Sequence, residues 1–285
     1  MVSAKKLYLD GKNRLERNNI ENASTDASYI IKKHSNKTRA ELLINDVLLS
    51  EEEETAFFED INKRLDNIPL QYILGRWEFM SLPFLINENV LIPRAETEIL
   101  VEKTLEKCKD KKNILVVDLC CGSGCIAISL AHYNKNINCI GIDISKKAID
   151  VARKNAKLNL VENQVAFKVF DILKHNCNQL KDISADIIVS NPPYIKTGDI
   201  KQLDNGIIEN EPLIALDGGQ DGYIFYKSII KNYKAILKKD GFLCFECGIS
   251  QSEFIKELMK LNGFWNIKIF KDYNAIDRVV IGKLK

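Results

Sequence analysis

The second part of this sequence alternates between strand-like and helix-like segments, and no other feature constrains the fold as much. Helical patterns lie near residues 124–133, 145–158, 223–238 and 250–262. Between them we predict strands at Ile114–Asp118, Asn138–Asp143, Val165–Phe170, Asp186–Ser190 and Phe242–Glu246. Such alternation predicts a parallel sheet covered on both faces. At the end of the chain a short turn joins Asn266–Phe270 to Arg278–Ile281, which predicts a final antiparallel hairpin.

The segment before this alternation contains helical patterns only. We predict a small helical bundle over residues 1–70, with Ser50 capping a helix whose first turn is the acidic run Glu51–Glu54. Its role is either packing or partner recognition. Residues 71–98 carry strand-type residues at Trp77–Phe79 and Phe84–Ile86, so we predict a β-hairpin linker there, with a helix starting near Thr97. Residues 99–285 then form the α/β domain.

Composition narrows the class of protein. Apolar residues make up 46% and charged residues 28% of the 285 residues, as in an ordinary globular protein. The net charge is only +2, which argues against a protein that grips nucleic acid through many phosphates. The N-terminus lacks a secretory apolar region, and no apolar run is long enough to span a membrane. We therefore expect a cytoplasmic protein.

The eight cysteines do not predict a metal site. The Cys244-Phe-Glu-Cys247 segment reads as a strand, in which residues three apart point to opposite faces and cannot share a metal. Neither a second CxxC nor a pair of histidines accompanies it. We expect buried, reduced thiols and no metal.

A glycine-containing loop follows the first strand of the α/β domain. The strand ends at Asp118 and runs through Leu119-Cys-Cys-Gly-Ser-Gly124 into a helix, which brings the backbone close to a ligand at the sheet edge. The next strand ends in Asp143, where a carboxylate can accept hydrogen bonds from both ribose hydroxyls of an adenosine. NAD fits this pattern too, but Asp118 would repel a pyrophosphate and suits the cationic S-adenosylmethionine.

The tetrapeptide Asn191-Pro-Pro-Tyr194 is delivered to the same edge by the fourth strand. The nitrogen of an amide or an exocyclic amine is a poor nucleophile, because its lone pair is delocalised. Two acceptors aimed at its two N–H groups stabilise the charge that develops as it attacks a methyl group. The Asn191 side-chain oxygen and the Pro192 carbonyl can be those acceptors, while Tyr194 stacks on the flat substrate group. We therefore expect Asn191, Pro192 and Tyr194 to be catalytic.

These motifs make the chain resemble the HemK-type protein-(glutamine-N5) methyltransferases over nearly its whole length. The likeness also rests on Gln71-Tyr-Ile-Leu-Gly75, Leu91-Ile-Pro-Arg94, Glu211-Pro212, Ala215-Leu-Asp-Gly-Gly219 and Asp277-Arg-Val-Val-Ile-Gly282. The resemblance implies a class I S-adenosylmethionine-dependent methyltransferase fold: a Rossmann-like, seven-stranded sheet with an antiparallel last strand, preceded by a helical domain that helps to hold the substrate protein. It implies that the substrate is the glutamine of the Gly-Gly-Gln loop in peptide chain release factors, and that the product is S-adenosylhomocysteine. From the near-neutral charge and the helical N-terminus we expect no direct binding of nucleic acid.

The family pattern also implies site residues. The cofactor is expected to contact Asp118, Cys120, Cys121, Gly122, Ser123, Gly124, Asp143, Ile172 and Asn191. The substrate is expected to contact Asn191, Pro192, Pro193, Tyr194 and Arg94, the last of which equally suits an ordinary surface ion pair.

The sequence departs from this pattern at several positions. Cys120 replaces the first loop glycine and Cys121 a usual threonine, and Ile172 stands where some relatives have a tryptophan. Cysteine is strained at a positive φ, so we expect that position 120 does not adopt one.

Three other functions remain open. An adenine-N6 nucleic-acid methyltransferase would use the same tetrapeptide on a flipped base. A related enzyme would methylate a glutamine of a ribosomal protein. A non-catalytic adaptor would bind the cofactor without turnover.

Overall fold

The computed structural model describes residues 1–109, 111–174 and 177–285, which form two compact units. The first comprises Met1–Arg76 with Asp204–Asn210, and the second comprises Trp77–Leu203 with Glu211–Lys285. None of the helices in these described ranges is long and apolar enough to cross a membrane.

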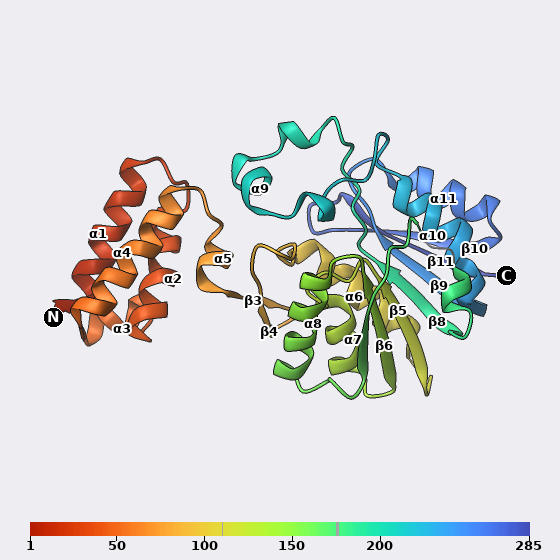
Figure 1. The fold of residues 1–285 in the computed structure, drawn as a ribbon, viewed down its shortest axis with the longest axis horizontal. Helices are drawn as coiled ribbons and strands as arrows, with labels where there is room; N and C mark the ends of the chain where they lie inside the picture. The colour runs from red at the N-terminus through yellow and green to blue at the C-terminus, as the bar shows by residue number, and fades with distance from the viewer. Residues whose placement is uncertain (110, 175–176) are drawn as a thin grey trace. The chain divides into compact units, whose positions relative to one another are not determined.

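The first unit is built from short helices packed around their apolar faces (Figure 1). They are α1 (Ala4–Arg17), α2 (Ala23–Ser35), α3 (Arg39–Ile44), α4 (Glu51–Leu65) and α5 (Leu70–Leu74). Leu7, Ile30, Phe57 and Ile61 are fully or almost fully buried between them. The short helix α9 (Asn205–Asn210) also belongs to this unit, but none of its described residues lies in the core.

The predicted cap of α4 is present as a capping box: the Ser50 side chain accepts from the Glu53 amide, and the Glu53 carboxylate accepts from the Ser50 amide. The expectation of helices only was wrong in one detail. β1 (Val2–Ser3) pairs antiparallel with β2 (Leu48–Leu49), and strands of two residues are too short to show a periodic pattern.

The second unit contains the predicted doubly wound sheet, in the order β10-β11-β9-β8-β5-β6-β7. Its strands are β5 (Ile114–Leu119), β6 (Ile137–Asp143), β7 (Val165–Val169), β8 (Ala185–Ser190), β9 (Leu237–Glu246), β10 (Phe264–Lys271) and β11 (Asp277–Leu284). β5 to β9 pair in parallel, whereas β11 pairs antiparallel with both β9 and β10. The seven-stranded sheet with an antiparallel end is thus confirmed.

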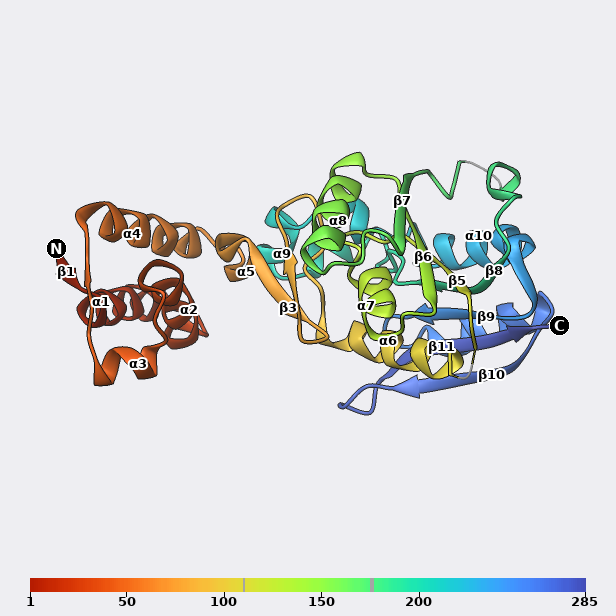
Figure 2. The same ribbon diagram turned by 90° about the horizontal axis from the view of Figure 1, so that it is seen from below.

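Helices cover both faces of this sheet (Figure 2). One face packs against α6 (Ala95–Lys107), α7 (Cys125–Tyr133) and α8 (Lys146–Leu158), and the other against α10 (Ile224–Asn232) and α11 (Ser252–Leu261). Single 3₁₀ turns occur at Cys177–Leu180, Ile200–Gln202, Leu213–Ala215 and Tyr233–Ile236. The helix predicted near 223–238 therefore ends at Asn232 and tightens into a 3₁₀ turn before β9. The helix expected near Thr97 begins two residues earlier, at Ala95.

The β-hairpin of strands β3 (Arg76–Phe79) and β4 (Leu82–Leu85) turns tightly at Met80 and Ser81, which both have positive φ. Phe79 and Phe84 are buried in the core of the second unit. Asn155 of α8 fastens the hairpin, because its side-chain amide accepts from the Leu85 amide at 2.7 Å and donates to the Leu85 carbonyl at 3.0 Å.

Candidate functional site

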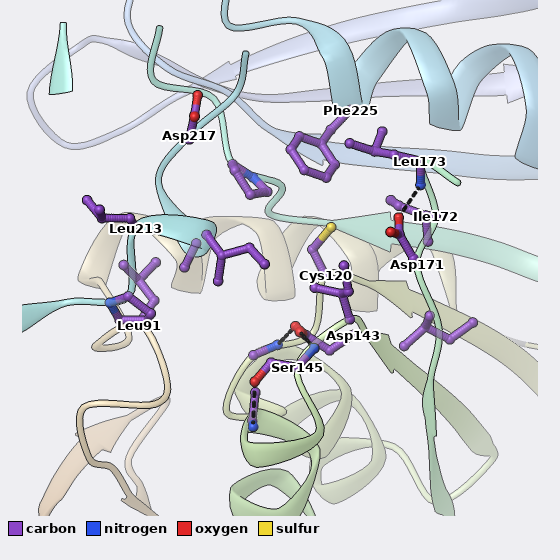
Figure 3. A pocket seen from close by; sticks show the side chains of 18 of the residues that line it. Leu91, Cys120, Asp143, Ser145, Asp171, Ile172, Leu173, Leu213, Asp217 and Phe225 are labelled. Carbon is purple, nitrogen blue, oxygen red and sulfur yellow. Dashed lines mark hydrogen bonds between the residues drawn. The ribbon is translucent and has the colours of Figure 1, made fainter. Parts of the chain in front are cut away.

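A cavity of about 460 Å³ opens at the edge of the sheet where the parallel strands end (Figure 3). This volume is in the range of small-molecule sites. Its wall is formed by residues that follow β5, β6, β7 and β8, together with residues 89–91, the segment 212–219 and the start of α10. The carboxyl ends of parallel strands meet at one edge, so the fold itself gathers these segments.

The loop between β5 and α7 forms one wall. Cys120, Gly122 and Gly124 all have positive φ, at 62°, 51° and 78°. The expectation that position 120 avoids a positive φ was therefore wrong: the backbone turns as it would for the glycine of the family pattern, and cysteine occupies the left-handed conformation. Figure 3 shows its sulfur directed into the cavity. Burial raises the pKa of the thiol well above its ordinary value, so it stays protonated.

Asp143 ends β6 and faces this loop across the cavity wall (Figure 3). One carboxylate oxygen accepts from the Gly122 amide and the other from the Ser145 amide, both at 2.9 Å. Burial raises the pKa of Asp143, while these backbone hydrogen bonds oppose the rise. The carboxylate is thus held in place on the cavity wall by two backbone amides.

Asp118 lies beneath the loop, fully buried and not on the cavity wall. Its Oδ2 accepts from the Ala127 amide at 3.2 Å, and its Oδ1 has no hydrogen-bond partner among the described residues. Burial, with a smaller contribution from the Asp143 charge, raises the pKa of Asp118 to about 8. The Ala127 hydrogen bond opposes this rise, and an approaching cation would stabilise the charged form further.

The remaining residues of the predicted cofactor set are spread around the loop. Ile172 follows β7 and lies on the cavity wall, and its carbonyl accepts from Ser228 and from the Tyr233 hydroxyl. Cys121 and Ser123 are buried behind the loop, and neither they nor Gly124 line the cavity.

Asn191-Pro-Pro-Tyr194 follows β8, whose last residue, Ser190, pairs with Leu119 at the end of β5, so the tetrapeptide begins beside the loop. Asn191 and Pro193 line the cavity, whereas Pro192 and Tyr194 lie next to them but off the lining. Ser190 fixes the end of β8 against β5, since its hydroxyl donates to the Leu119 carbonyl at 2.6 Å.

Three residues that the sequence did not identify hold this tetrapeptide. The side-chain nitrogen of Asn191 donates to the Thr97 hydroxyl at 3.2 Å, and the Thr97 hydroxyl donates to a carboxylate oxygen of Glu246 at 2.6 Å. Gln251 donates to the Tyr194 carbonyl at 3.0 Å. Thr97 lies where the sequence predicted a helix to start, and Glu246 is a carboxylate at the end of a predicted strand. Those were the only signals in the sequence.

Arg94 does not line the cavity. Its guanidinium pairs with the carboxylate of Glu211, which also accepts from the Ile92 amide at 3.3 Å. The Glu211 carboxylate is buried, so this contact joins the segment before α6 to the segment that precedes the 3₁₀ turn at Leu213–Ala215. The structure thus gives Arg94 an ion-pairing partner within the protein.

Six cysteines of the described ranges are free thiols buried in the protein interior: Cys108, Cys121, Cys125, Cys139, Cys244 and Cys247. Burial raises the pKa of Cys244 and of Cys247 to about 12, and the pKa of Cys125 also to about 12. Within the described ranges, no group of three or more His, Cys, Asp or Glu side chains is arranged to hold a metal ion.

Comparison with known proteins places this geometry in a family. Residues 110–280 match the model of a methyltransferase domain, and residues 6–75 match the model of the PrmC N-terminal domain. A release factor glutamine methyltransferase of Clostridium botulinum is 35% identical over 97% of this chain and 97% of its own length. Another of the same name, from Geobacter sulfurreducens, is 36% identical over 93% of this chain and 91% of its own length.

Solved structures agree with the fold. The catalytic domain of hMettl16, solved in complex with the MAT2A 3′UTR hairpin 6, is 14% identical and superimposes with a TM-score of 0.54, with 85% of each chain covered. This likeness concerns the fold alone. The sequence matches are more specific, since they extend over both units. They show that the chain belongs to the release factor glutamine methyltransferases.

Proposed function

We propose that this enzyme transfers a methyl group from S-adenosylmethionine to the side-chain amide nitrogen of the glutamine in the Gly-Gly-Gln motif of peptide chain release factors, releasing S-adenosylhomocysteine. One observation carries the proposal: Asn191 lines the same cavity as Cys120, Gly122 and Asp143. A carboxamide of the substrate and a nucleoside can therefore bind next to each other in one cavity. The similarity to release factor glutamine methyltransferases of two Clostridium species supports the choice of substrate.

The residues present fit S-adenosylmethionine. The Asp143 carboxylate would hold the ribose hydroxyls, Ile172 and Phe170 would line the adenine site, and Asp118 beneath the loop would favour the cationic amino-acid end. A side chain added at Gly122 would meet no atom within 4 Å, so the backbone there is open to a ligand. Bound, the cofactor supplies a methyl group on a positively charged sulfur.

The tetrapeptide prepares the amide nitrogen for attack. The Asn191 Oδ1 accepts one N–H of the glutamine amide, and the Pro192 carbonyl accepts the other. The two prolines keep that carbonyl in place. As the nitrogen becomes tetrahedral and positive, both oxygens stabilise the charge more strongly than they stabilise the planar amide, and this difference lowers the barrier.

Neither a strong base nor a thiolate takes part. Burial, with a contribution from the nearby Glu246, raises the pKa of the Tyr194 phenol well above its ordinary value, so its hydroxyl stays protonated at neutral pH. Tyr194 adjoins the cavity lining, and in this proposal its ring would stack beside the bound amide. The methylated nitrogen is acidic and loses its proton to water after the transfer. In-line alignment of nitrogen and methyl group provides most of the remaining acceleration.

The unit formed by Met1–Arg76 and Asp204–Asn210 contributes to recognition of the release factor in this proposal. The reaction takes place in the cytoplasm, where translation terminates.

The test is incubation with cofactor tritiated on its methyl group and three acceptors: a release factor, the same release factor with its Gly-Gly-Gln glutamine changed to alanine, and a mixture of nucleic acid and ribosomal proteins. We expect label in the first acceptor only, and the labelled peptide to be one methyl group heavier at the glutamine. Label in nucleic acid alone would point to an adenine methyltransferase. Label in a ribosomal protein alone would identify the protein as the related ribosomal-protein glutamine methyltransferase. If no acceptor is labelled, the protein would instead be a non-catalytic adaptor that binds the cofactor.

A further inference from the structure

The Asn191 carboxamide has two ends of similar shape and opposite polarity. Only its oxygen can accept an N–H of the substrate, whereas its nitrogen can only donate. Turning the group by half a rotation would present two N–H groups to the substrate amide and abolish the stabilisation described above. Something in the protein must therefore decide which end faces the cavity.

A chain of hydrogen bonds reaches Asn191 from the interior. The Asn191 nitrogen donates to Thr97 Oγ1 at 3.2 Å, and the Thr97 hydroxyl donates to Glu246 Oε2 at 2.6 Å. The three residues come from the start of α6, the end of β8 and the end of β9. Thr97 and Glu246 are both 2% exposed. Water therefore does not replace these bonds easily.

The polarity of this chain has one solution when Glu246 is ionised. A carboxylate only accepts, so the single hydroxyl proton of Thr97 must point to Glu246. The hydroxyl oxygen then has only lone pairs left for Asn191, which must offer its nitrogen. The carboxamide oxygen is left on the side of the cavity.

We propose that Thr97 and Glu246 are positioning residues that set the orientation of the Asn191 carboxamide: Glu246 fixes the Thr97 proton, and Thr97 together with the nearby Glu246 carboxylate keeps the Asn191 nitrogen on their side. This inference rests on the proposed function, because it assigns to Asn191 the task of accepting a hydrogen bond from the substrate amide.

The surroundings of Glu246 make the arrangement sensitive to protonation. The pKa of Glu246 is raised to about 7, mainly by burial and to a smaller extent by the charge of Glu96 on α6. The hydrogen bonds from Thr97 and Asn191 and the charge of Arg278 on β11 oppose this rise. Tyr194, Cys125 and Cys247 also face it, all with raised pKa values that keep them neutral. A protonated Glu246 can donate to Thr97, which frees the Thr97 proton for the Asn191 oxygen and permits the reversed orientation.

The kinetic test compares Thr97→Val with Thr97→Ser and Thr104→Val. Thr104 lies on the same helix, is also fully buried, and its hydroxyl has no hydrogen-bond partner among the described residues, so it is a matched control. We expect Thr97→Val to lower kcat by roughly tenfold or more, while the KM for release factor and the Kd for S-adenosylhomocysteine change less than about twofold. Thr97→Ser should restore kcat, and Thr104→Val should leave it unchanged.

A second test does not depend on turnover. Selective ¹⁵N labelling of asparagine gives side-chain amide signals, and the Asn191 signal is the one that disappears in Asn191→Ala. In the wild type it should shift with pH around the Glu246 pKa of about 7, and in Glu246→Gln it should not. As the pH falls below 7, protonation of Glu246 should lower the kcat of the wild type. The kcat of Glu246→Gln should lack this decrease.

The outcomes separate the two proposals. If the wild type fails to methylate the release factor, the proposed function is wrong, whereas the amide titration still reports on the positioning chain. If the wild type is active but Thr97→Val behaves like Thr104→Val, or if the Asn191 signal ignores pH in the wild type, the positioning role is wrong. Should Thr97→Val fail to fold, the titration of the wild type and Glu246→Gln decides alone.

Discussion

Gly218 lies directly against the backbone of Tyr194. A Cβ added at residue 218 would stand 2.7 Å from the Tyr194 Cα and 2.8 Å from its carbonyl carbon. The Gly218 amide donates to the Ile195 carbonyl at 2.7 Å, and the Ile195 amide donates to the Leu216 carbonyl at 3.0 Å. The Leu-Asp-Gly-Gly motif therefore backs the Asn-Pro-Pro-Tyr tetrapeptide, which explains in physical terms why the two occur together in this chain.

The first prediction concerns this contact. Gly218→Ala should force the backbone of residues 193–195 to move, since a Cβ within 3 Å of backbone atoms has no flexible side chain to displace. We expect kcat for release factor methylation to fall on the order of 10- to 100-fold, because the Pro192 and Asn191 acceptors are displaced from the substrate. Gly198→Ala is the control, since a Cβ there meets nothing within 4 Å. Equal activity of the two variants would show that the tetrapeptide does not depend on Gly218.

The second prediction concerns the strained cysteine of the loop. Cys120 has a φ of 62°, and this conformation costs a residue with a side chain about 1–2 kcal/mol of stability. Glycine adopts it without that strain, but its greater loss of backbone entropy on folding costs about 0.5–1 kcal/mol. Cys120→Gly should therefore raise the free energy of unfolding by up to about 1 kcal/mol in urea titrations without cofactor. Cys121→Gly, at a buried position that does not have a positive φ, should lower it. The prediction fails if Cys120→Gly is destabilised as much as Cys121→Gly.

The third prediction uses the buried carboxyl beneath the loop. With a pKa of about 8, Asp118 is mostly protonated at pH 7 in the free protein. A bound ammonium group favours the ionised form, so binding of S-adenosylhomocysteine at pH 7 should release a proton and tighten between pH 7 and 8. Calorimetry in two buffers of different ionisation enthalpy measures the release. Asp118→Asn should abolish the part of the proton release that comes from Asp118. If the proton release of Asp118→Asn equals that of the wild type, Asp118 does not lose a proton when S-adenosylhomocysteine binds.

The same group has a predictable effect on stability. Its pKa is raised on folding, from 3.8 to about 8, so the unfolded chain gives up the proton first as pH rises. Between these two values the folded state binds more protons, and rising pH therefore lowers the free energy of unfolding. Asp118→Asn removes this contribution, and its stability should fall less steeply than that of the wild type between pH 6 and 8.

The sequence predicted what depends on local pattern. The alternation of strands and helices, the antiparallel end and the loop after β5 are all present, because periodicity and glycines act over a few residues. The parts that it missed depend on residues far apart: Thr97 and Glu246 are 149 positions apart, and Arg94 and Glu211 are 117 apart. Nothing in a single sequence indicates such pairs. The positive φ of Cys120 was missed for another reason: cysteine seldom adopts it, so the residue type argued against the conformation that is present.

The last prediction concerns the residue on which the proposed chemistry depends. Asn191→Ala removes one of two preorganised acceptors from the cavity wall, and the loss of one such group typically lowers turnover on the order of 100-fold or more. Because the carboxamide acts on the charge that develops during transfer, kcat should fall while the KM for release factor and the Kd for S-adenosylhomocysteine stay within about threefold. Single-turnover transfer of tritiated methyl groups measures the first, and calorimetry the last.

Asn89 provides the matched control, because it also lines the cavity but bonds to its neighbours Asn87 and Glu88. Asn89→Ala should therefore keep most of the turnover that Asn191→Ala loses. If both variants lose activity equally, the cavity wall as a whole and not the Asn191 acceptor governs the rate. If Asn191→Ala keeps full turnover, the amide nitrogen is not activated by this residue, and the catalytic role assigned to the tetrapeptide has to be given up.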